Sequence, residues 1–351
     1  MPVSVDLSLI EGPYLTDLLD QPHALQQTVD GLDESPALQK FARALTRGDY
    51  QRAVLTGMGS SFQALHPLHL ALCEFGIPSQ MVETSELVLY MRRVLDERTL
   101  LIAVSQSGRS AETIRLLGLA AGHVPTVGVT NTPDSPLAAQ SDAVVLMRAG
   151  QETTVACKTY VATLVALEWL SAMLRGADPA KTRAELQQAA PAATAYLTRW
   201  RSHVESLLAR LEGTRHVFVC GRGTSLASAE SGGLILKESA HFAAEGMSAA
   251  AFRHGPFEML GPHVFVVVFE GDAASSALNR RLMEDTVAAG GRSVLVSEDA
   301  ADEVFRLPCV PSPVRPVVEI LPVQMMSLAL SALTGHHAGR FERATKITTI
   351  E

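Results

Sequence analysis

Short apolar runs rich in β-branched residues alternate along this chain with longer stretches in which apolar residues recur every three or four positions. The run Ala53–Thr56 precedes a helical pattern over residues 62–76, and the run Leu100–Val104 precedes another over residues 111–123. Runs this short and continuously apolar are typical of strands buried on both faces. Buried strands that alternate with helices predict an α/β fold with a doubly wound parallel sheet and right-handed crossovers.

The strand pattern occurs twice. Three segments of the first half have counterparts in the second half at a nearly constant offset of about 165 residues, which chance similarity does not maintain. The pairs are AVLTGMGSS from Ala53 with VFVCGRGTS from Val217, LLIAVSQSG from Leu100 with FVVVFEGD from Phe265, and TVGVTN from Thr126 with SVLVSED from Ser293. We therefore expect two tandem α/β domains. The expected limits are a helical lead at 1–43, a first domain at 44–185, a helical linker at 186–207, a second domain at 208–340 and a tail at 341–351.

The composition narrows the range of partners. Of the 351 residues, 47% are hydrophobic and 19% are charged, which is typical of a folded globular protein with room for two domains. The net charge of −8 argues against nucleic acid or an anionic membrane as a partner, because both require a basic face. Any bound phosphate must therefore be held by local groups.

Cysteine spacing and the N-terminal residues bear on the compartment. Cys73, Cys157, Cys220 and Cys309 lie far apart without a C-x-x-C pair, so we expect neither a disulfide framework nor a zinc site. The first residues lack the basic and then apolar pattern of a signal peptide, and no apolar stretch has the length expected of a membrane span. These features predict a cytoplasmic protein with no membrane partner.

Small polar residues crowd the point where the run Leu100–Val104 ends. The stretch Ser105–Gly108 reads Ser-Gln-Ser-Gly, and Ser110 stands directly before the expected helix. One interpretation is an ordinary turn with an N-cap serine. The other is a phosphate site, because a helix N-terminus offers unpaired N–H groups and serine hydroxyls add hydrogen bonds.

The corresponding stretch of the second copy is acidic. It reads Glu270-Gly271-Asp272, and two carboxylates at a helix N-terminus would repel a phosphate. The difference between the copies favours a phosphate site in the first copy, with the second copy adapted to another purpose.

A dinucleotide site is the alternative use of these loops. Gly57-x-Gly59 and Gly221-x-Gly223 each follow a predicted strand, as do the first two glycines of the dinucleotide-binding fingerprint. The third glycine of that fingerprint is replaced by Phe62 and Leu226, and no G-x-x-x-x-G-K-[ST] loop occurs. We therefore expect no nucleotide cofactor.

Three residues outside the first copy are candidates for chemistry. Glu238 lies within an otherwise apolar helical pattern, His254 precedes Gly255-Pro256, and Lys346 lies in the C-terminal tail. A carboxylate, an imidazole and an amine are suited to proton transfer and to carbonyl chemistry. Each also has an ordinary interpretation, as a solvated helix face, a loop histidine bonded to backbone, or a solvated lysine.

Taken in order, the motifs QPHAL, GSS, SQSG, TTVACKTY, LKES, RHGP and KITTIE resemble those of the sugar isomerase (SIS) domain family. The resemblance runs from Tyr14 to Glu351 and is strongest to the isomerase half of glucosamine-6-phosphate synthase and to stand-alone SIS-type glucosamine-6-phosphate deaminases. It implies two tandem flavodoxin-like domains, a sugar phosphate as ligand, no cofactor, no metal, and a homodimer with shared active sites.

The resemblance also implies a role for each matching residue. Glu238 matches the base that moves a proton between C1 and C2 of the sugar. His254 matches the ring-opening histidine, which reaches into the neighbouring subunit's site, and Lys346 matches the lysine that contacts the open sugar or forms an imine with it. Val155 matches a backbone contact near the sugar, and the phosphate-binding positions are matched by Ser61, Ser105, Gln106, Ser107 and Ser110.

Some positions depart from the family pattern. A lysine often found three residues before the glutamate is Ile235, and Cys157-Lys158-Thr159 replaces a more usual Ser-Thr-Lys. Together with Arg109, Ile235 is a position where substrate choice would differ.

The sequence also lacks a glutaminase half, so we expect no synthesis of amino sugars from glutamine. The predicted reaction is the conversion of glucosamine 6-phosphate to fructose 6-phosphate and ammonia. The alternatives are aldose–ketose isomerisation or deglycation without deamination, and a non-catalytic sugar-phosphate sensor.

Overall fold

A computed structural model describes residues 5–343, 345 and 346. The chain divides into two compact units, each built on one sheet. The first-sheet unit comprises His23–Gln151, Lys158–Gln187 and the described residues of Ala344–Glu351. The second-sheet unit comprises the described residues of Met1–Pro22 together with Glu152–Cys157 and Gln188–Arg343. Both sheets are parallel, which confirms the predicted α/β class with two tandem doubly wound domains.

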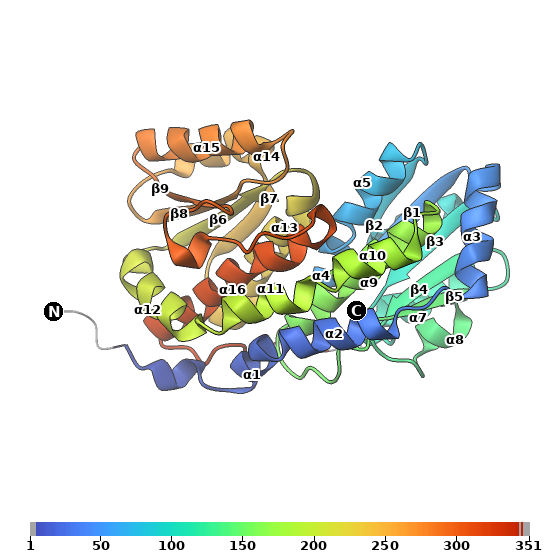
Figure 1. Ribbon diagram of the computed structural model, residues 1–351, viewed down its shortest axis with the longest axis horizontal. Helices are drawn as coiled ribbons and strands as arrows, with labels where there is room; N and C mark the ends of the chain where they lie inside the picture. The colour runs from blue at the N-terminus through green and yellow to red at the C-terminus, as the bar shows by residue number, and fades with distance from the viewer. Residues whose placement is uncertain (1–4, 344, 347–351) are drawn as a thin grey trace. The chain divides into compact units, whose positions relative to one another are not determined.

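The first sheet has five parallel strands in the order β2-β1-β3-β4-β5 (Figure 1). Crossover helices separate the strands along the chain, as parallel pairing requires. The elements of this unit are α2 (Gln21–Gly31), α3 (Pro36–Arg47), β1 (Arg52–Gly57), α4 (Ser60–Gln63), α5 (His66–Glu74), β2 (Ser79–Glu83), α6 (Thr84–Tyr90), η2 (Arg92–Val94), β3 (Thr99–Val104), α7 (Ala111–Ala120), β4 (Thr126–Thr130), α8 (Pro136–Gln140), β5 (Ala143–Leu146), α9 (Lys158–Leu174) and α10 (Pro179–Leu186).

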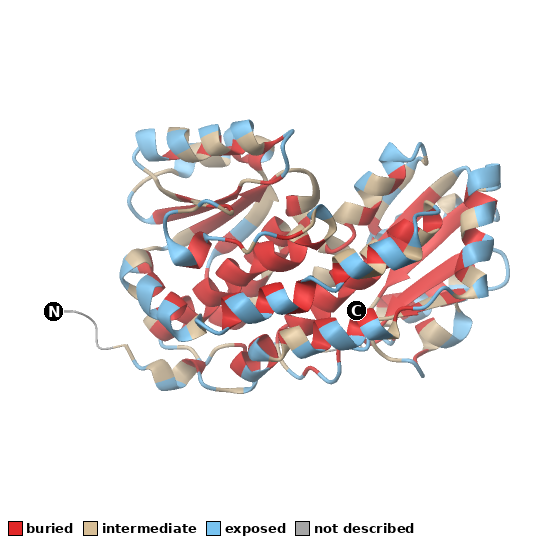
Figure 2. Ribbon diagram, in the orientation of Figure 1, coloured by how far each residue is buried: buried red, intermediate tan, exposed pale blue. Residues whose placement is uncertain are grey.

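Apolar side chains cover both faces of the first sheet. On one face, Val54 of β1 and Leu101 of β3 belong to a buried cluster with Leu87 of α6 and Leu116 of α7. Helix α9 is apolar all round and buried along nearly its whole length (Figure 2), which is typical of a helix inside a core. The continuous apolar runs that predicted the strands therefore reflect burial on two faces.

The second sheet repeats this arrangement with four parallel strands in the order β7-β6-β8-β9. Its apolar face packs on α14 and α15 through a cluster that includes Phe218, Phe252, Val266 and Leu282. The elements are η1 (Leu7–Ile10), α1 (Pro13–Leu19), α11 (Ala189–Leu197), α12 (Trp200–Leu211), β6 (His216–Gly221), η3 (Gly223–Ser225), α13 (Leu226–Ala240), β7 (Ala244–Ser248), α14 (Ala249–Arg253), η4 (Pro256–Met259), β8 (Val264–Phe269), α15 (Ser276–Ala288), β9 (Arg292–Val296), η5 (Glu303–Phe305), η6 (Ser312–Val314) and α16 (Arg315–Thr334).

Helix α13 is held between its own sheet and α16. At Gly233 an added Cβ would lie 2.2 Å from the backbone nitrogen of Gly246 in β7, so the close approach of helix to strand requires glycine. On its other side α13 packs against α16. This double packing fixes the helix that carries Glu238.

Helix α16 corrects one expectation from the sequence. Ser312–Thr334 is long and apolar enough to cross a membrane, although no such stretch was expected. Most of this stretch is buried inside the fold, and a core helix can be as long and as apolar as a membrane-spanning one (Figure 2). The helix forms the core of the second-sheet unit.

Glu319 is the charged exception in α16. Ser225 Oγ donates a hydrogen bond of 2.9 Å to Glu319 Oε1, whereas the buried Oε2 has no hydrogen-bond partner among the described residues. Burial, aided by the negative charge of Asp272, raises the pKa of Glu319 to about 8, although the Ser225 bond and Arg315 act in the opposite direction. Glu319 is therefore held mainly as the neutral acid at neutral pH.

We expect the Glu319→Gln variant to lose part of the pH dependence of stability. Glu319 keeps its proton in the folded protein up to about pH 8 but loses it near its usual pKa of 4.5 when unfolded. The free energy of unfolding should therefore fall as pH rises between these values, with a slope of up to about 1.4 kcal/mol per pH unit from this group. Glutamine keeps the acceptor for Ser225 and removes the titration.

Urea unfolding at several pH values within this window measures the slope. The exposed Glu205, in α12, gives the matched control Glu205→Gln, which should keep the wild-type slope. An unchanged slope in Glu319→Gln would contradict the assignment.

Candidate active site

The loops after β1 and β3 both lie at the carboxyl edge of the first sheet. The two strands are neighbours and run parallel, while the chain continues from β1 to β2 on one side and from β3 to β4 on the other. This is the topological switch point of an open α/β sheet, where ligands bind. Ser61 follows β1 in the short helix α4, and the stretch Ser105–Ser110 follows β3. The structure thus places all five predicted phosphate-binding residues on loops that flank one switch point.

Hydroxyl groups shape the loop after β3. The backbone N–H of Gly108 donates to Ser105 Oγ at 3.1 Å, and the N–H of Arg109 donates to Ser107 Oγ at 3.2 Å. Ser110 is the N-cap of α7, where its Oγ accepts from the backbone N–H of Thr113 at 3.3 Å. The ordinary interpretation of this stretch as a turn with an N-cap is therefore correct as far as it goes. Ser105 and Ser107, which each accept one such bond, still have a hydroxyl proton to donate to an anion. Ser110 Oγ also shares a hydrogen bond of 2.8 Å with Thr113 Oγ1.

Gln106 is fixed by its carbonyl group. That oxygen accepts hydrogen bonds from the N–H of Asn131 at 3.0 Å and from Thr130 Oγ1 at 3.2 Å, at the end of β4. These bonds attach the loop to the next strand. They involve only the backbone of Gln106, a half-buried residue, so its side-chain amide can still change rotamer. Arg109 is exposed, and its guanidinium donates a hydrogen bond of 2.8 Å to the carbonyl of Asp134.

Gly108 sets the path of this loop. Its φ of +60° lies in the left-handed region, and an added Cβ would approach Ser135 Oγ to 2.3 Å. Only glycine meets both conditions without strain.

The switch point of the second sheet carries different chemistry. Glu270 Oε1 accepts from Ser276 Oγ at 2.7 Å and from Arg280 Nε at 2.8 Å. Asp272 Oδ1 accepts from Ser275 Oγ at 2.8 Å. These bonds engage side-chain donors of Ser275, Ser276 and Arg280 with the two carboxylates, and the weaker phosphate affinity expected of this copy stays a prediction.

Glu238 lies in the last turn of α13 and is half-buried, between the exposed Lys237 and the buried Ser239. Close by, the fully buried Tyr14 shares a hydrogen bond of 3.0 Å with Ser327 Oγ. Burial raises the pKa of Tyr14, and the neighbouring charges of Cys157 and Glu238 act in the same direction. Sequence reasoning missed Tyr14, because an aromatic residue in an amphipathic lead is indistinguishable there from an ordinary core residue.

The other predicted site residues lie in different surroundings. His254 is exposed at the C-cap of α14, and its backbone N–H donates to the carbonyl of Ala251 at 2.9 Å. Val155 is buried in the loop Glu152–Cys157, where the N–H of Cys157 donates to Glu152 Oε1 at 2.9 Å. Lys346 is half-buried in the first-sheet unit. The residues of the KITTIE motif after Lys346 lie outside the described residues.

A family model for the SIS domain matches this chain twice, at residues 49–173 and 210–333. The chain belongs to the SIS domain family. The two matched segments contain the strands of the first and of the second sheet, so each SIS domain has its own switch point.

Several known proteins are similar over nearly the whole chain. Glutamine–fructose-6-phosphate aminotransferase (isomerizing) of Pyrococcus horikoshii is 30% identical over 349 residues, which is 96% of this chain but 57% of that protein. This SIS protein thus spans little more than half the length of that relative. The C-terminal domain of glucosamine-fructose-6-phosphate aminotransferase of Francisella tularensis has a TM-score of 0.82 at 22% identity and covers 97% of this chain and 98% of that one. Glucosamine-6-phosphate deaminase of Thermotoga maritima has a TM-score of 0.79 at 17% identity and covers 97% of this chain and 100% of that one.

We expect Gly108→Ala to destabilise the protein by about 1–3 kcal/mol, because alanine must adopt a left-handed conformation and displace Ser135. Gly118, in the last turn of α7, is the matched control: an added Cβ meets nothing within 4 Å there. Gly118→Ala should stabilise the protein by about 0.5–1 kcal/mol, since alanine is the better helix former. Urea unfolding measures both effects, and equal effects of the two substitutions would contradict the strained loop.

Proposed function

We propose that this SIS protein is a hexosamine-6-phosphate deaminase that converts glucosamine 6-phosphate and water to fructose 6-phosphate and ammonia. The observation that carries the proposal is the serine loop Ser105–Ser110 at the switch point of the first sheet. The acidic counterpart at the second switch point supports one phosphate site per chain. In this proposal, Ser61 and the serine loop bind the phosphate group, which positions the sugar for reaction.

The chemistry is a proton shift followed by hydrolysis. His254 assists opening of the sugar ring by proton transfer. Glu238 takes the proton from C2 of the open aminoaldose, which gives an enolamine, and returns it to C1, which gives a ketimine at C2. Water then adds to the ketimine carbon, and ammonia leaves with the former amine nitrogen. Lys346 stabilises the intermediate, and Val155 contributes a backbone contact to the sugar. The reaction consumes water and requires no glutamine.

Glu238 has surroundings suited to this role. It projects from a helix that is packed between β7 and α16, so its position is fixed by the core rather than by a loop. Its half-buried state keeps one side open to a substrate. Tyr14, buried beside the end of α13, is a positioning residue in this proposal.

The protein acts as a cytoplasmic homodimer in this proposal. His254 is exposed at the end of a short helix, which supports a role toward a second chain. The neighbouring Gly255 has a φ of +149°, and an added Cβ would meet nothing within 4 Å, so the turn after His254 is open to a partner.

We expect wild-type protein to release ammonia from glucosamine 6-phosphate, and Glu238→Gln to lose at least about a hundredfold in kcat, because general-base catalysis contributes about 10²–10⁴. A coupled ammonia assay over a panel of amino-sugar phosphates measures this. Calorimetry with fructose 6-phosphate is the control: Glu238→Gln should still bind, whereas a Ser105→Ala, Ser107→Ala double variant should not.

Three outcomes would redirect the proposal. Isomerisation of glucose 6-phosphate without ammonia release favours an aldose–ketose isomerase. Turnover only of sugar phosphates that carry an amine-linked substituent favours a deglycase. Tight binding of fructose 6-phosphate with no turnover of any panel member favours a sensor.

Shared active sites predict complementation between inactive variants. Mixing Glu238→Gln with His254→Ala under conditions of subunit exchange should restore up to about a quarter of wild-type activity, because a heterodimer then contains one site with both residues. Each variant mixed with itself is the control. A fully active monomer in dilute solution, seen by sedimentation during turnover, would rule out this arrangement.

A further inference from the structure

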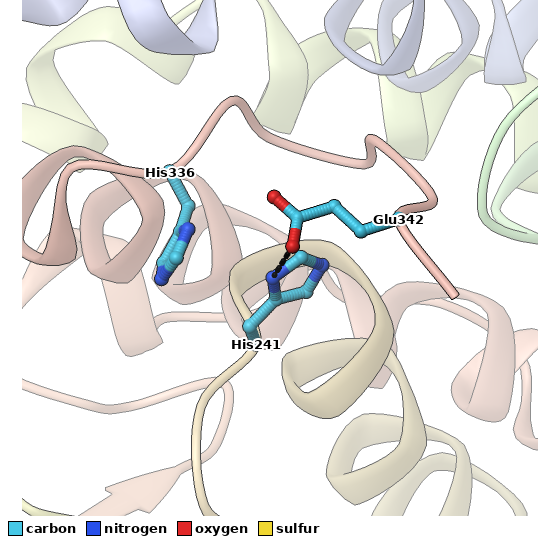
Figure 3. A group of neighbouring side chains, drawn as sticks. All are labelled: His241, His336 and Glu342. Carbon is cyan, nitrogen blue, oxygen red and sulfur yellow. Dashed lines mark ion pairs between the residues drawn. The ribbon is translucent and has the colours of Figure 1, made fainter. Parts of the chain in front are cut away.

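His241, His336 and Glu342 form a group of possible metal ligands in the second-sheet unit, which we name the tail cluster (Figure 3). One nitrogen or oxygen from each residue lies within 4.8 Å of the other two. We propose that the tail cluster binds a divalent transition-metal ion, with Zn²⁺ as the best match. Two imidazoles and one carboxylate are a ligand set that Zn²⁺ prefers, and the expectation of no zinc site from cysteine spacing does not apply to it.

The tail cluster joins the ends of two packed helices. His241 follows α13 in a left-handed conformation, with a φ of +49°. His336 follows α16, and its backbone N–H donates to the carbonyl of Ser331 at 2.9 Å. A non-glycine residue with positive φ carries strain, which persists where the surrounding structure holds it in place. Here that conformation directs the His241 ring toward Glu342, as Figure 3 shows.

The hydrogen bond of His241 determines which of its nitrogens is free to bind a metal. Nε2 lies 3.2 Å from the carbonyl oxygen of Arg340, which can only accept, so Nε2 carries the proton. In the neutral ring, Nδ1 then presents a lone pair. This lone pair faces Glu342 Oε2 at 3.9 Å. A cation placed between them would be held by both atoms, and a metal-bound histidine usually donates its other N–H to a carbonyl in this way.

The spacing fits a bridging ion better than a hydrogen bond. At 3.9 Å, Nδ1 of His241 and Oε2 of Glu342 are too far apart for a hydrogen bond. Two ligands about 2.0–2.2 Å from a shared tetrahedral Zn²⁺ lie about 3.4 Å apart, so the pair must close by about 0.5 Å when the ion binds. The ring of His336 stands with its centroid 4.9 Å from that of His241. Because His336 and Glu342 are only partly buried or exposed, side-chain rotation brings the third donor into range.

Backbone hydrogen bonds already hold the chain that carries the ligands. The N–H of Gly339 donates to the carbonyl of Ser239 at 2.9 Å, and the N–H of Ala338 donates to the carbonyl of Leu9 at 3.0 Å. At Gly339, an added Cβ would lie 2.5 Å from Tyr14 Cβ. The segment is therefore ordered before any ion binds, which lowers the entropic cost of binding.

The ion would connect the segment before Lys346 to the end of α13. His241 stands three positions after Glu238, and Glu342 stands four positions before Lys346. With three protein ligands, the remaining coordination positions face solvent and take water. The role that follows is structural, because the ion ties the chain ahead of the predicted catalytic lysine to a core helix. This goes beyond the proposed deaminase and does not depend on it.

Competition against a chromophoric zinc chelator tests the proposal, on tag-free full-length protein stripped of metal with EDTA. We expect one Zn²⁺ per chain in the wild type and a loss of affinity of at least about tenfold in His336→Ala and in Glu342→Gln. His337, exposed and next to His336, gives the matched control His337→Ala, which should bind as the wild type does. Co²⁺ in place of Zn²⁺ should give visible absorption bands in the wild type and the control but not in the other two variants.

Thermal unfolding separates binding from misfolding. At a Zn²⁺ concentration about tenfold above the wild-type dissociation constant, the ion should raise the Tm of the wild type and of His337→Ala clearly more than that of His336→Ala and Glu342→Gln, since stabilisation follows binding to the folded state. Without metal, all four proteins should unfold at similar temperatures. No saturable binding in the wild type, or equal affinity in all four proteins, would overturn the proposal and leave His241 and Glu342 as an ion pair.

Discussion

The parallel pairing of β1 with β3 is the constraint on which the serine loop depends. Their register, with Thr56 opposite Ala103, brings the carboxyl ends of both strands to the same level. The chain then leaves the two strands in opposite directions along the sheet, which makes this edge the topological switch point. The loops there are built of small residues, because glycine permits the turn at position 108 and serine supplies compact hydroxyl groups.

The second sheet shows that strand pairing determines where the switch point lies, whereas the side chains of the following loops determine its chemistry. Its strands β6 and β8 pair in the same way, and the following loops separate at the same edge. There Glu270 binds Ser276 and Arg280, and Asp272 binds Ser275, so the donors at this edge are occupied within the protein. The neutral Glu319 lies below the same edge, where Ser225 reaches it. The two switch points therefore differ in their side chains: serine hydroxyls and glycine at the first, and carboxylates bonded to neighbouring serine and arginine side chains at the second.

Local sequence patterns predicted strands and helices, but they could not predict contacts between segments that are distant in the sequence. Short apolar runs located β1, β3, β6 and β8, because burial on both faces of a parallel sheet leaves a direct trace in the sequence. The position of Ser110 before a helical pattern likewise predicted the N-cap of α7. The buried helix α16 was not recognised as a long apolar element, because Arg315, Glu319 and Pro322 interrupt its pattern. The tail cluster and Tyr14 depend on the packing of α13 against α16 and on the path of the chain after α16, which no local pattern encodes.

Helix α13 carries a residue that the sequence predicted, Glu238, and its position is fixed by contacts that the sequence did not predict. Its first residues follow Ser225, which bonds to the buried acid of α16, and its last turn carries Glu238 and ends at His241. Gly233 lets it lie directly on β7, and α16 closes the opposite side, so the helix is not free to shift along the sheet. A proton-transfer group needs its position held to within a fraction of an ångström, and a helix packed on two sides meets that need better than a loop. The strained conformation at His241 then has a physical role. It ends the helix abruptly after Glu238, and the tail that returns past Ser239 packs against that end through the Gly339 hydrogen bond.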